Sequence, residues 1–247
     1  MVEPRPYYHR RLPHYHPTGS VFFITFRLAD SLPVHVAQEL LDERDKELRE
    51  LKERLSGPTY RLAVYQLAKK YFGRFDSWLD RCARGPQWLK DEAIAQIVMR
   101  EIHALHGQRY RLLAFCVMAN HVHLLIEMMS YEQLAPGSSA STTAPYPLAE
   151  ILRLLKGRTA RYCNQALGRT GAFWHHESYD HVVRDDKELG RIVKYIVENP
   201  VKAGLVDDWR QWRYTYVAPE VMDMMSVGAS YSSSVCSSVG SPAGRTS

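Results

Sequence analysis

Hydrophobic residues alternate with polar ones, or form short runs rich in β-branched and aromatic residues, in four segments of the chain. The first segment, VFFITFRL, is bounded on both sides by turn-forming residues. Two later segments are separated only by Ala119 and Asn120, which indicates a tight turn or kink between neighbouring strands. The predicted strands are Val21–Leu28, Tyr110–Met118, His121–Glu127 and Tyr179–Arg184.

Helix-type spacing, with apolar residues three and four positions apart, is found between these strands. Glycine–proline pairs at 57–58 and 85–86 interrupt it. Residues 60–82 are expected to form one or two short helices. The other predicted helices run from Pro33 to about Leu55, from about Lys90 to Leu105, from Pro147 to about Leu167, and from Asp185 or Asp186 to Pro200.

The order of elements is strand, helical insertion, helix, strand, strand, helix, strand, helix. A largely antiparallel sheet with helices packed on it fits this order, so the predicted fold class is α+β. We expect one domain over residues 1–219, with the insertion at about 33–82 and a flexible loop of small residues at about 129–146. The Ser-rich tail at 220–247 offers little apolar surface, so it is expected to be disordered.

The composition, with 45% apolar and 24% charged residues, is typical of a globular protein. No apolar run is long enough to span a bilayer and no secretory signal is evident, so we expect a cytoplasmic protein that is not in a membrane. The four cysteines form no CxxC pair, which argues against a zinc ribbon or a thioredoxin-like motif. A net charge of +5 suits a polyanionic partner.

His121 and His123 are two residues apart in a predicted strand. Both imidazoles should therefore project from one face of the sheet, while Val122 points to the other. Two neighbouring imidazoles form half of a metal site. The alternative is a partly exposed pair of sheet histidines with no ligand role, since the chain has eleven histidines and a second such pair, His14 and His16.

Tyr195 lies on the last predicted helix, away from the apolar stripe of that helix. Asn199 follows four residues later and is therefore its neighbour on one face. Because Pro200 disfavours helix at the residue before it, we expect the Asn199 amide at a helix end, free to turn toward a cation. The alternative is an aromatic side chain that covers the core, followed by an asparagine cap.

Basic and aromatic side chains gather in two later segments and are candidate DNA contacts. Arginine can hold a phosphate through two donors and lysine acts as a point charge, whereas flat rings suit stacking on unpaired bases. A solvated basic helix face and ordinary core aromatics are the alternatives. The candidates are Arg153, Lys156, Arg158 and Arg161 on the helix, and Trp174, His176 and Arg184 in the segment GAFWHHESYDHVVRD.

Three motifs follow one another in the order MANHVHLLIE, FWHHESYDHVVRD and YIVENPVKAGLV. Together they resemble the REP-associated tyrosine transposases, within the single-tyrosine HUH transposase family, over most of the chain from Val21 to about Tyr216. The resemblance implies a ferredoxin-like HUH nuclease architecture. The inserted helices, the small-residue loop and the Ser-rich tail depart from the family pattern.

The resemblance also implies a role for each matched residue. His121 and His123 fall on the histidine pair of the family, Tyr195 on its nucleophile, and Asn199 on the polar residue that completes the metal site. The implied cofactor is Mg²⁺ or Mn²⁺, without a small-molecule cofactor, and the implied partner is single-stranded or hairpin DNA. A bacterial, nucleoid-associated location is implied, and a monomer using its own Tyr195 is favoured over a dimer.

The implied reaction is cleavage and strand transfer of single-stranded DNA through a 5′-phosphotyrosine, beside a REP-like hairpin. Two other function classes stay open. One is a non-catalytic or domesticated single-stranded nucleic-acid-binding protein on the same fold. The other is a metal-dependent hydrolase with water as nucleophile, in which a third histidine joins the pair: His175, His176 or His181. The lack of a PCxxC to accompany a His-x-Glu argues against a deaminase.

Overall fold

The computed structural model describes residues 20–81, 85–129 and 147–224, and it confirms the α+β class. The strands are β1 (Val21–Leu28), β2 (Tyr110–Val117), β3 (His121–Met128), β4 (Trp174–Val182) and β5 (Thr215–Val217). The α-helices are α1 (Val34–Arg54), α2 (Gly57–Arg81), α3 (Glu92–Leu105), α5 (Pro147–Ala166) and α6 (Asp186–Lys202). Short 3₁₀ helices span Trp88–Lys90 and Trp209–Gln211.

The strands form one five-stranded sheet in the order β4-β1-β3-β2-β5, and each neighbouring pair is antiparallel. Helices connect β1 to β2 and β3 to β4, so the first four strands have the β-α-β-β-α-β topology of a ferredoxin-like fold. β5 extends the edge beside β2. The hydrophobic pattern did not predict this strand, because three residues are too few to show an alternation.

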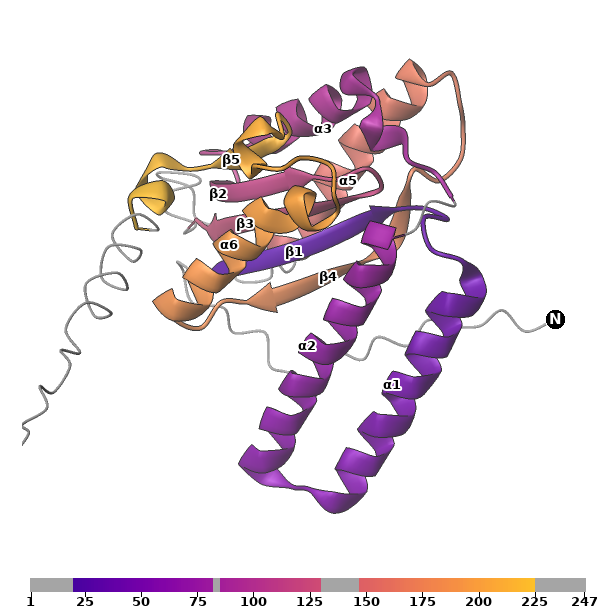
Figure 1. Ribbon diagram of the computed structural model, residues 1–247, viewed down its shortest axis with the longest axis vertical. Coiled ribbons are helices and arrows are strands. Elements are labelled where there is room, and N and C mark those ends of the chain that lie inside the picture. Colours follow the sequence, from indigo (N-terminus) through magenta and orange to yellow (C-terminus); the bar gives the residue numbers. More distant parts are fainter. Residues whose placement is uncertain (1–19, 82–84, 130–146, 225–247) are drawn as a thin grey trace, which may run out of the picture.

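Helices cover both faces of the sheet, with α3 and α5 side by side on one face and α6 on the other (Figure 1). Alternate residues of β1 enter the two resulting cores. Phe22, Ile24 and Phe26 pack under α3 and α5, whereas Phe23 packs under α6. Burial of each such side chain stabilises the fold by about 2 kcal/mol, so the strand register is strongly specified.

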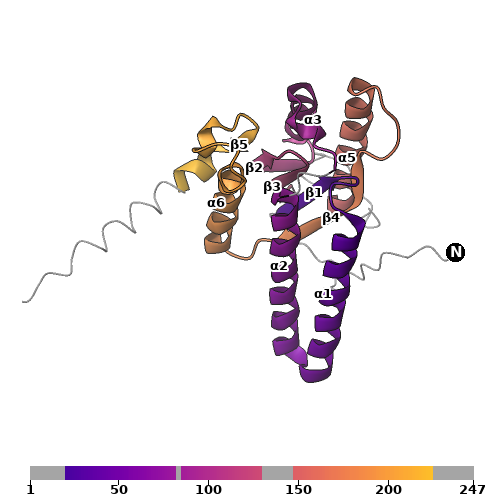
Figure 2. The ribbon, with the colours of Figure 1, turned by 45° about the vertical axis from the view of Figure 1, so that its right-hand side comes forward.

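The insertion is a long hairpin of α1 and α2 that projects away from the sheet (Figure 2). We call it the inserted hairpin. α2 is one continuous helix rather than one or two short ones. It begins at Gly57, where we expected a break, because Pro58 occupies its first turn and a missing N–H costs nothing there. The hairpin has its own core, formed by Leu32, Val36, Leu40, Leu67, Tyr71 and Leu79.

Two predicted boundaries are wrong. β4 begins at Trp174, earlier than the predicted Tyr179. Its first half pairs with β1 but is polar, so no hydrophobic pattern in the sequence indicated a strand there. α6 continues through Pro200 to Lys202 and ends before Gly204, whose φ of 67° provides the stop.

The chain folds beyond the domain boundary that we expected at residue 219. Residues 219–224 are helical and Val221 is buried in the core under α6. The remainder of the predicted tail and residues 130–146 of the predicted loop lie outside the described residues. Within the described ranges, none of the helices combines the length and the apolar character that crossing a bilayer requires.

The two ends of the inserted hairpin meet where Gly85 approaches Asp30. Asp30 has a φ of 58° and Gly85 a φ of 101°. A Cβ added at Gly85 would lie 2.7 Å from the backbone oxygen of Asp30. Only glycine therefore fits this crossing without moving the backbone.

The substitution Gly85→Ala should lower the free energy of unfolding by about 2–3 kcal/mol, because the new methyl group adds a clash to an unfavourable φ. Urea denaturation would measure the loss. Gly57→Ala is the matched control: its φ is also positive but open space surrounds it, so about 1 kcal/mol should be lost. Equal losses in the two variants would contradict the close approach at Gly85.

Candidate metal centre and nucleophile

β3 carries the two predicted metal ligands on the face of the sheet that α6 covers. Val122 points the other way, into the core under α3 and α5, as expected from strand alternation. His121 is 1% exposed and His123 is fully buried. The pair is therefore not the partly exposed sheet pair that the alternative interpretation required.

Hydrogen bonds at the Nδ1 atoms orient both imidazole rings. Nδ1 of His121 donates to Oδ1 of Asn120 at 2.7 Å, and Asn120 in turn donates to the carbonyl oxygen of Leu79 at 3.0 Å. Nδ1 of His123 lies 2.8 Å from the hydroxyl oxygen of Thr25. With both Nδ1 atoms protonated, each Nε2 presents a lone pair, and the two Nε2 atoms lie 3.1 Å apart.

α6 brings the predicted nucleophile and the predicted third ligand to the same point. Asn199 is buried, and its amide nitrogen lies 3.1 Å from Nε2 of His123. A half-turn of that amide would exchange its nitrogen and oxygen and present Oδ1 instead. Tyr195 lies one turn earlier, and its ring centroid is 5.4 Å from that of His123.

Asn199 occupies the interior of α6, not the free helix end that Pro200 suggested. A proline in the last turn removes only one backbone donor, and the turn is still closed by the bond from the Ala203 nitrogen to the Asn199 carbonyl oxygen. The predicted helix end at Asn199 is therefore wrong. Burial and the contact with His123 hold the side chain at the site.

Two carboxylates that we did not predict enter the site from α2. Oδ1 of Asp76 lies 3.5 Å from Nε2 of His123 and 3.8 Å from Nε2 of His121. The other oxygen of Asp76 accepts a hydrogen bond from the Tyr195 hydroxyl. Asp80 is one turn further along α2, and its Oδ1 lies 3.9 Å from Nε2 of His121.

A sequence signal for these carboxylates existed. Phe72, Asp76 and Asp80 are spaced by four residues, so they form one stripe along α2. Phe72 stacks on Tyr179 of β4 with 4.1 Å between the ring centroids, which places the stripe against the domain. Acidic residues on the contact face of a helix need a partner, since a buried carboxylate is otherwise costly.

The assembled group fits a divalent cation. Asp76, His121 and His123 each offer a ligand atom, and these atoms lie within 4.8 Å of one another. Ligands about 2.1 Å from a single ion are about 3–3.5 Å apart, close to the separations of these atoms. Among the described residues, the buried side-chain atoms without a hydrogen-bond partner are Oδ1 of Asp76, Oδ1 of Asp80 and Oδ1 of Asn199. All three belong to this group.

Burial sets the protonation states of the group. It lowers the pKa of His121 and of His123 to about 3, so both rings are neutral, as ligands must be. It raises the pKa of Asp76, and together with the charge of Asp76 it raises the pKa of Asp80 to about 7. Burial and the neighbouring Asp76 also raise the pKa of Tyr195. A cation at this point would favour the ionised form of all three acids.

The hydrolase interpretation required a third histidine beside the pair. Among the described residues, the third side chain beside His121 and His123 that could bind a metal is Asp76, and none of the three candidate histidines joins them. His175 and His176 lie against each other at the start of β4, with 4.6 Å between the ring centroids. Nε2 of His181 lies 3.2 Å from a carboxylate oxygen of Glu188.

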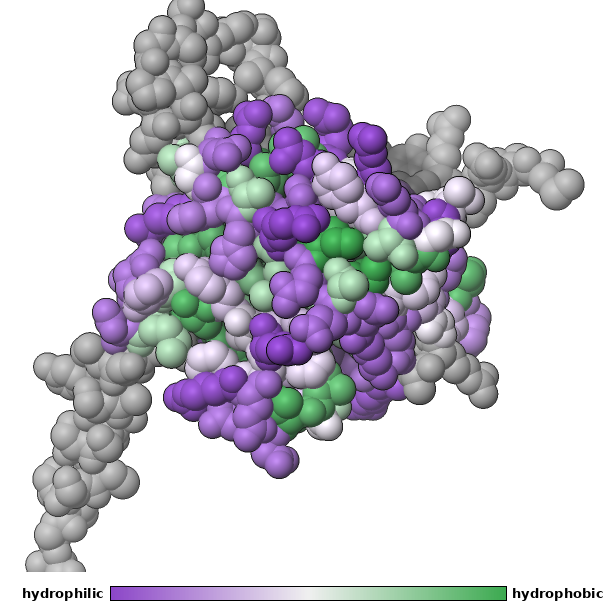
Figure 3. All heavy atoms as spheres, turned by 90° about the horizontal axis from the view of Figure 1, so that it is seen from above, coloured by the Kyte–Doolittle hydropathy of each residue, from purple (hydrophilic) through white to green (hydrophobic). Residues whose placement is uncertain are grey.

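The predicted basic contacts on α5 are separated from the centre by the sheet. α5 packs on the face opposite the histidine pair, so the exposed Arg153, Arg158 and Arg161 lie on the far side of the molecule. The surface seen in Figure 3 is largely hydrophilic, with small separate hydrophobic areas. Arg158 is partly engaged, since its guanidinium lies 3.8 Å from the carboxylate of Glu101 on α3.

The other predicted DNA contacts divide into internal and exposed side chains. Lys156 donates to two backbone carbonyls and one hydroxyl of β4. Trp174 is buried, and its indole N–H donates to the hydroxyl of Thr159. Both side chains therefore hold α5 to β4. His176 and Arg184 are exposed.

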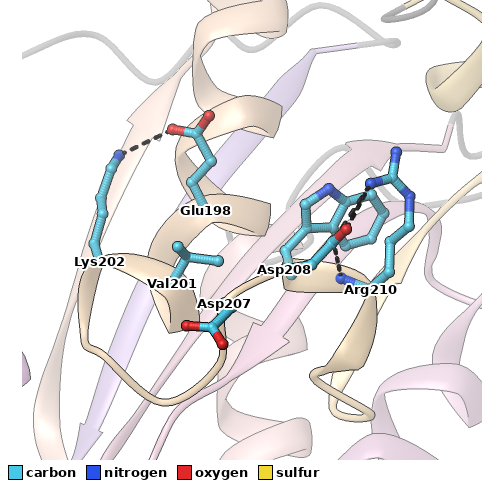
Figure 4. A pocket seen from close by; sticks show the side chains of 7 residues that line it. Glu198, Val201, Lys202, Asp207, Asp208 and Arg210 are labelled. Atoms are coloured by element: carbon cyan, nitrogen blue, oxygen red, sulfur yellow. Dashed lines mark hydrogen bonds and ion pairs between the residues drawn. The ribbon is translucent and has the colours of Figure 1, made fainter.

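A shallow depression of about 360 Å³ lies at the C-terminal end of α6 (Figure 4). It is lined by Glu198, Val201, Lys202, Asp207, Asp208, Trp209 and Arg210. Nζ of Lys202 lies 3.4 Å from a carboxylate oxygen of Glu198 and 5.2 Å from the ring centroid of Tyr195. The depression therefore adjoins the tyrosine, but neither histidine lines it.

The topology and this group define an α+β protein of ferredoxin-like type, with a buried centre of metal-ligating residues beside a tyrosine. The expected resemblance to the REP-associated tyrosine transposases is confirmed: a Haemophilus influenzae protein of that name is 26% identical over 107 residues. The match covers 43% of this chain and 58% of the relative, so it spans less than two thirds of the relative's length. No protein-family model matches the chain.

Solved structures that overlap with the chain include a REP-associated tyrosine transposase bound to a REP hairpin, with a TM-score of 0.45, 16% identity, and coverage of 83% of this chain and 80% of that one. Another is described as a transposase from Deinococcus radiodurans R1, with a TM-score of 0.27, 13% identity, and coverage of 76% and 97%. Overlaps this loose transfer no property to the chain.

Glu188, in the first turn of α6, ties the inserted hairpin to the domain. Its buried carboxylate accepts hydrogen bonds from the Tyr65 hydroxyl at 2.7 Å and from Nζ of Lys69 at 3.0 Å, both on α2. The backbone nitrogen of Arg184 donates to it at 3.1 Å. Burial alone would raise the pKa of Glu188, but these hydrogen bonds outweigh it and lower the pKa to about 2.

The substitution Glu188→Gln should lower the free energy of unfolding by about 2 kcal/mol at pH 7, the usual worth of charge-assisted hydrogen bonds. Because the pKa is lower in the folded chain than the ordinary 4.5, this contribution is complete above pH 4.5 and is lost as the pH falls toward 2. Urea denaturation between pH 7 and pH 3.5 should show the two proteins converging.

Glu198→Gln is the control for this prediction. Glu198 is on the same helix, and its carboxylate forms partly exposed ion pairs with Lys194 and Lys202. It should change the free energy of unfolding by less than about 0.5 kcal/mol. A difference between Glu188→Gln and the parent that does not vary with pH would refute the assigned role.

Proposed function

We propose that this protein is a single-tyrosine HUH transposase. It would cut and rejoin single-stranded DNA, at or beside small REP-like hairpins. Tyr195 is the proposed nucleophile, and His121, His123 and Asn199 are proposed to hold Mg²⁺ or Mn²⁺. The resemblance to a REP-associated tyrosine transposase supports the assignment.

One observation carries this proposal: four side chains from two separate elements converge on a single buried point. Asn199 lies 3.1 Å from Nε2 of His123, and the Tyr195 ring lies beside the same imidazole. The Tyr195 hydroxyl donates to Asp76, whose other carboxylate oxygen lies beside both imidazoles, and a tyrosine that only covered the core would not need this link. Imidazole nitrogens alone suit zinc, whereas the neighbouring oxygens favour a harder cation such as Mg²⁺ or Mn²⁺.

Tyr195 would make the new bond. Its hydroxyl oxygen attacks the scissile phosphorus, the bond from phosphorus to the 3′ oxygen breaks, and the tyrosine proton ends on the released 3′-OH. The product is a 5′-phosphotyrosine, which preserves the phosphodiester energy, so a second 3′-OH can reverse the step without ATP.

The bound cation would act as a Lewis acid on a phosphate oxygen. His121 and His123 serve in this reaction by remaining neutral, since their pKa values of about 3 leave one nitrogen of each ring with a free lone pair. The buried position of the pair keeps bulk water away, which protects the phosphotyrosine from hydrolysis.

DNA outside the centre would be held by the exposed basic side chains. Arg184 and His176 flank β4, whereas Arg153, Arg158 and Arg161 are on the opposite side of the sheet and could reach only a duplex or hairpin that wraps around the molecule. Lys156 and Trp174 would support this surface from within the fold. A monomer with Tyr195 acting on its own histidine pair, at the bacterial nucleoid, is the simplest arrangement.

A non-catalytic, domesticated nucleic-acid-binding protein is the second candidate. The observation that favours it is the burial of the whole centre, including both histidines, Asp76 and Asn199. The two candidates differ in one product: only the transposase forms a covalent bond with DNA.

The substitution Tyr195→Phe should abolish the covalent adduct while DNA binding stays within about twofold, because it removes only the attacking oxygen. The assay is incubation of the full chain with labelled single-stranded hairpin oligonucleotides and Mn²⁺, followed by a denaturing gel. Tyr179→Phe, in the neighbouring ring cluster, is the control and should keep the adduct. A folded parent protein that gives no adduct on varied hairpins would favour the non-catalytic candidate.

Replacing Arg153 and Arg161 together by Gln should weaken hairpin binding and make it less dependent on salt, since each lost phosphate contact reduces the salt slope by about one. Fluorescence anisotropy at several salt concentrations would measure both. Arg100→Gln on α3 is the matched control, with its exposed side chain 3.8 Å from the carboxylate of Glu101. An unchanged slope in the double variant would remove α5 from the DNA path.

A further inference from the structure

Asp76 reaches the centre from the inserted hairpin, which is the part of the chain that departs from the family pattern. Its carboxylate faces two ways. Oδ2 accepts the hydrogen bond of the Tyr195 hydroxyl. Oδ1 lies 3.5 Å and 3.8 Å from the two facing Nε2 atoms of His123 and His121, and no hydrogen-bond donor meets it.

From this geometry we infer that Asp76 is both a metal ligand and the residue that positions the nucleophile. One carboxylate oxygen joins His121 and His123 on the cation, and the other holds the Tyr195 hydroxyl beside it. The inserted hairpin is thus a working part of the active centre. This inference rests on the proposed function for its catalytic half, whereas its metal-binding half stands on the ligand geometry alone.

A purely structural role would explain less. The inserted hairpin is already attached at other points: Glu188 accepts hydrogen bonds from Tyr65 and Lys69, and Phe72 stacks on Tyr179. Attachment does not require a carboxylate that is 3% exposed and has one oxygen without a donor. Such a group is costly to bury unless a positive charge compensates it.

Asp80 shows what distinguishes Asp76. It lies on the same helix one turn away, and its Oδ1 also lacks a donor. However, its oxygen is 3.9 Å from only one of the two imidazoles, its side chain is 20% exposed, and it makes no hydrogen bond to Tyr195 among the contacts of the described residues. Asp80 is therefore a control from the next turn of the same helix, with the same side chain but without the contacts to both imidazoles and to Tyr195.

The first experiment measures Mn²⁺ binding to the full chain without DNA, through the electron paramagnetic resonance signal of free Mn²⁺. Asp76→Asn keeps the shape of the side chain and should weaken Mn²⁺ binding about 10- to 100-fold. Asp80→Asn should change it less than about threefold. Equal Mn²⁺ affinity in Asp76→Asn and the parent, or no Mn²⁺ binding by the parent, overturns the inference.

The second experiment measures the rate of adduct formation with hairpin DNA at saturating Mn²⁺, where any loss reflects the nucleophile and not the metal. Asp76→Asn should remain slower than the parent by about tenfold or more. Asp76→Glu, which keeps the charge but lengthens the side chain, should retain more Mn²⁺ affinity than Asp76→Asn and still form the adduct slowly. A faster adduct in Asp76→Asn would overturn the inference, because Asp76 would then be obstructing the phosphate site.

The two proposals fail separately. Mn²⁺ binding that depends on Asp76, without an adduct on any hairpin, would overturn the proposed transposase and support the ligand assignment. An adduct that forms equally well in the parent and in Asp76→Asn, with equal Mn²⁺ affinity, would support the transposase and overturn the role of Asp76. Thermal unfolding of each variant confirms that the folded chain is being compared.

Discussion

The structure depends on two imidazole nitrogens that face each other 3.1 Å apart where water is excluded. With both Nδ1 atoms protonated, the two Nε2 lone pairs repel each other at this distance, and burial prevents protonation from relieving the repulsion, since it lowers the pKa of both rings to about 3. Oxygens of Asp76, Asp80 and Asn199 add further negative potential. A cation satisfies all of these groups at once, which makes this point the electrostatic focus of the fold.

Three elements supply this focus, and each is held there by contacts away from the ligands. β3 is fixed by its register with β1, in which Thr25 lies opposite His123. α6 is fixed by the core residues Val193 and Ile196. α2 is fixed by its stripe of contacts with the domain and by the bond from Asn120 to the Leu79 carbonyl oxygen. The same Asn120 orients His121, so the position of the inserted hairpin and the orientation of a ligand are coupled through one amide.

The sequence predicted the elements whose hydrophobic period was clear. The strands around His121, the helix that carries Tyr195 and the inserted helices were all found in this way, and local spacing placed Asn199 beside Tyr195. β4 and β5 were missed in whole or in part because strand pairing, and not hydrophobic alternation, defines them. The helix end at Pro200 was misplaced because backbone bonds from the Ala203 and Leu205 nitrogens to the Asn199 and Pro200 carbonyl oxygens close the last turn despite the proline.

The roles of α2 and α5 could not be predicted from the sequence for a different reason. Asp76 and His123 are 47 positions apart. The four-residue spacing of Asp76 from its neighbours on the stripe shows that they share one face of a helix, but it does not show that this face packs against the histidines. The α5 arginines were predicted DNA contacts, yet the sheet lies between them and the histidine pair. Both outcomes depend on which face of the sheet each helix covers, which is a property of the tertiary fold.

The contact of Phe72 and Asp76 with the domain has a thermodynamic consequence. A cation held by Asp76 on α2 and by the histidines on β3 would bind the folded chain and not the unfolded one. Attachment of the inserted hairpin would then depend on the concentration of free cation as well as on its own packing. The hairpin and the centre would gain or lose stability together.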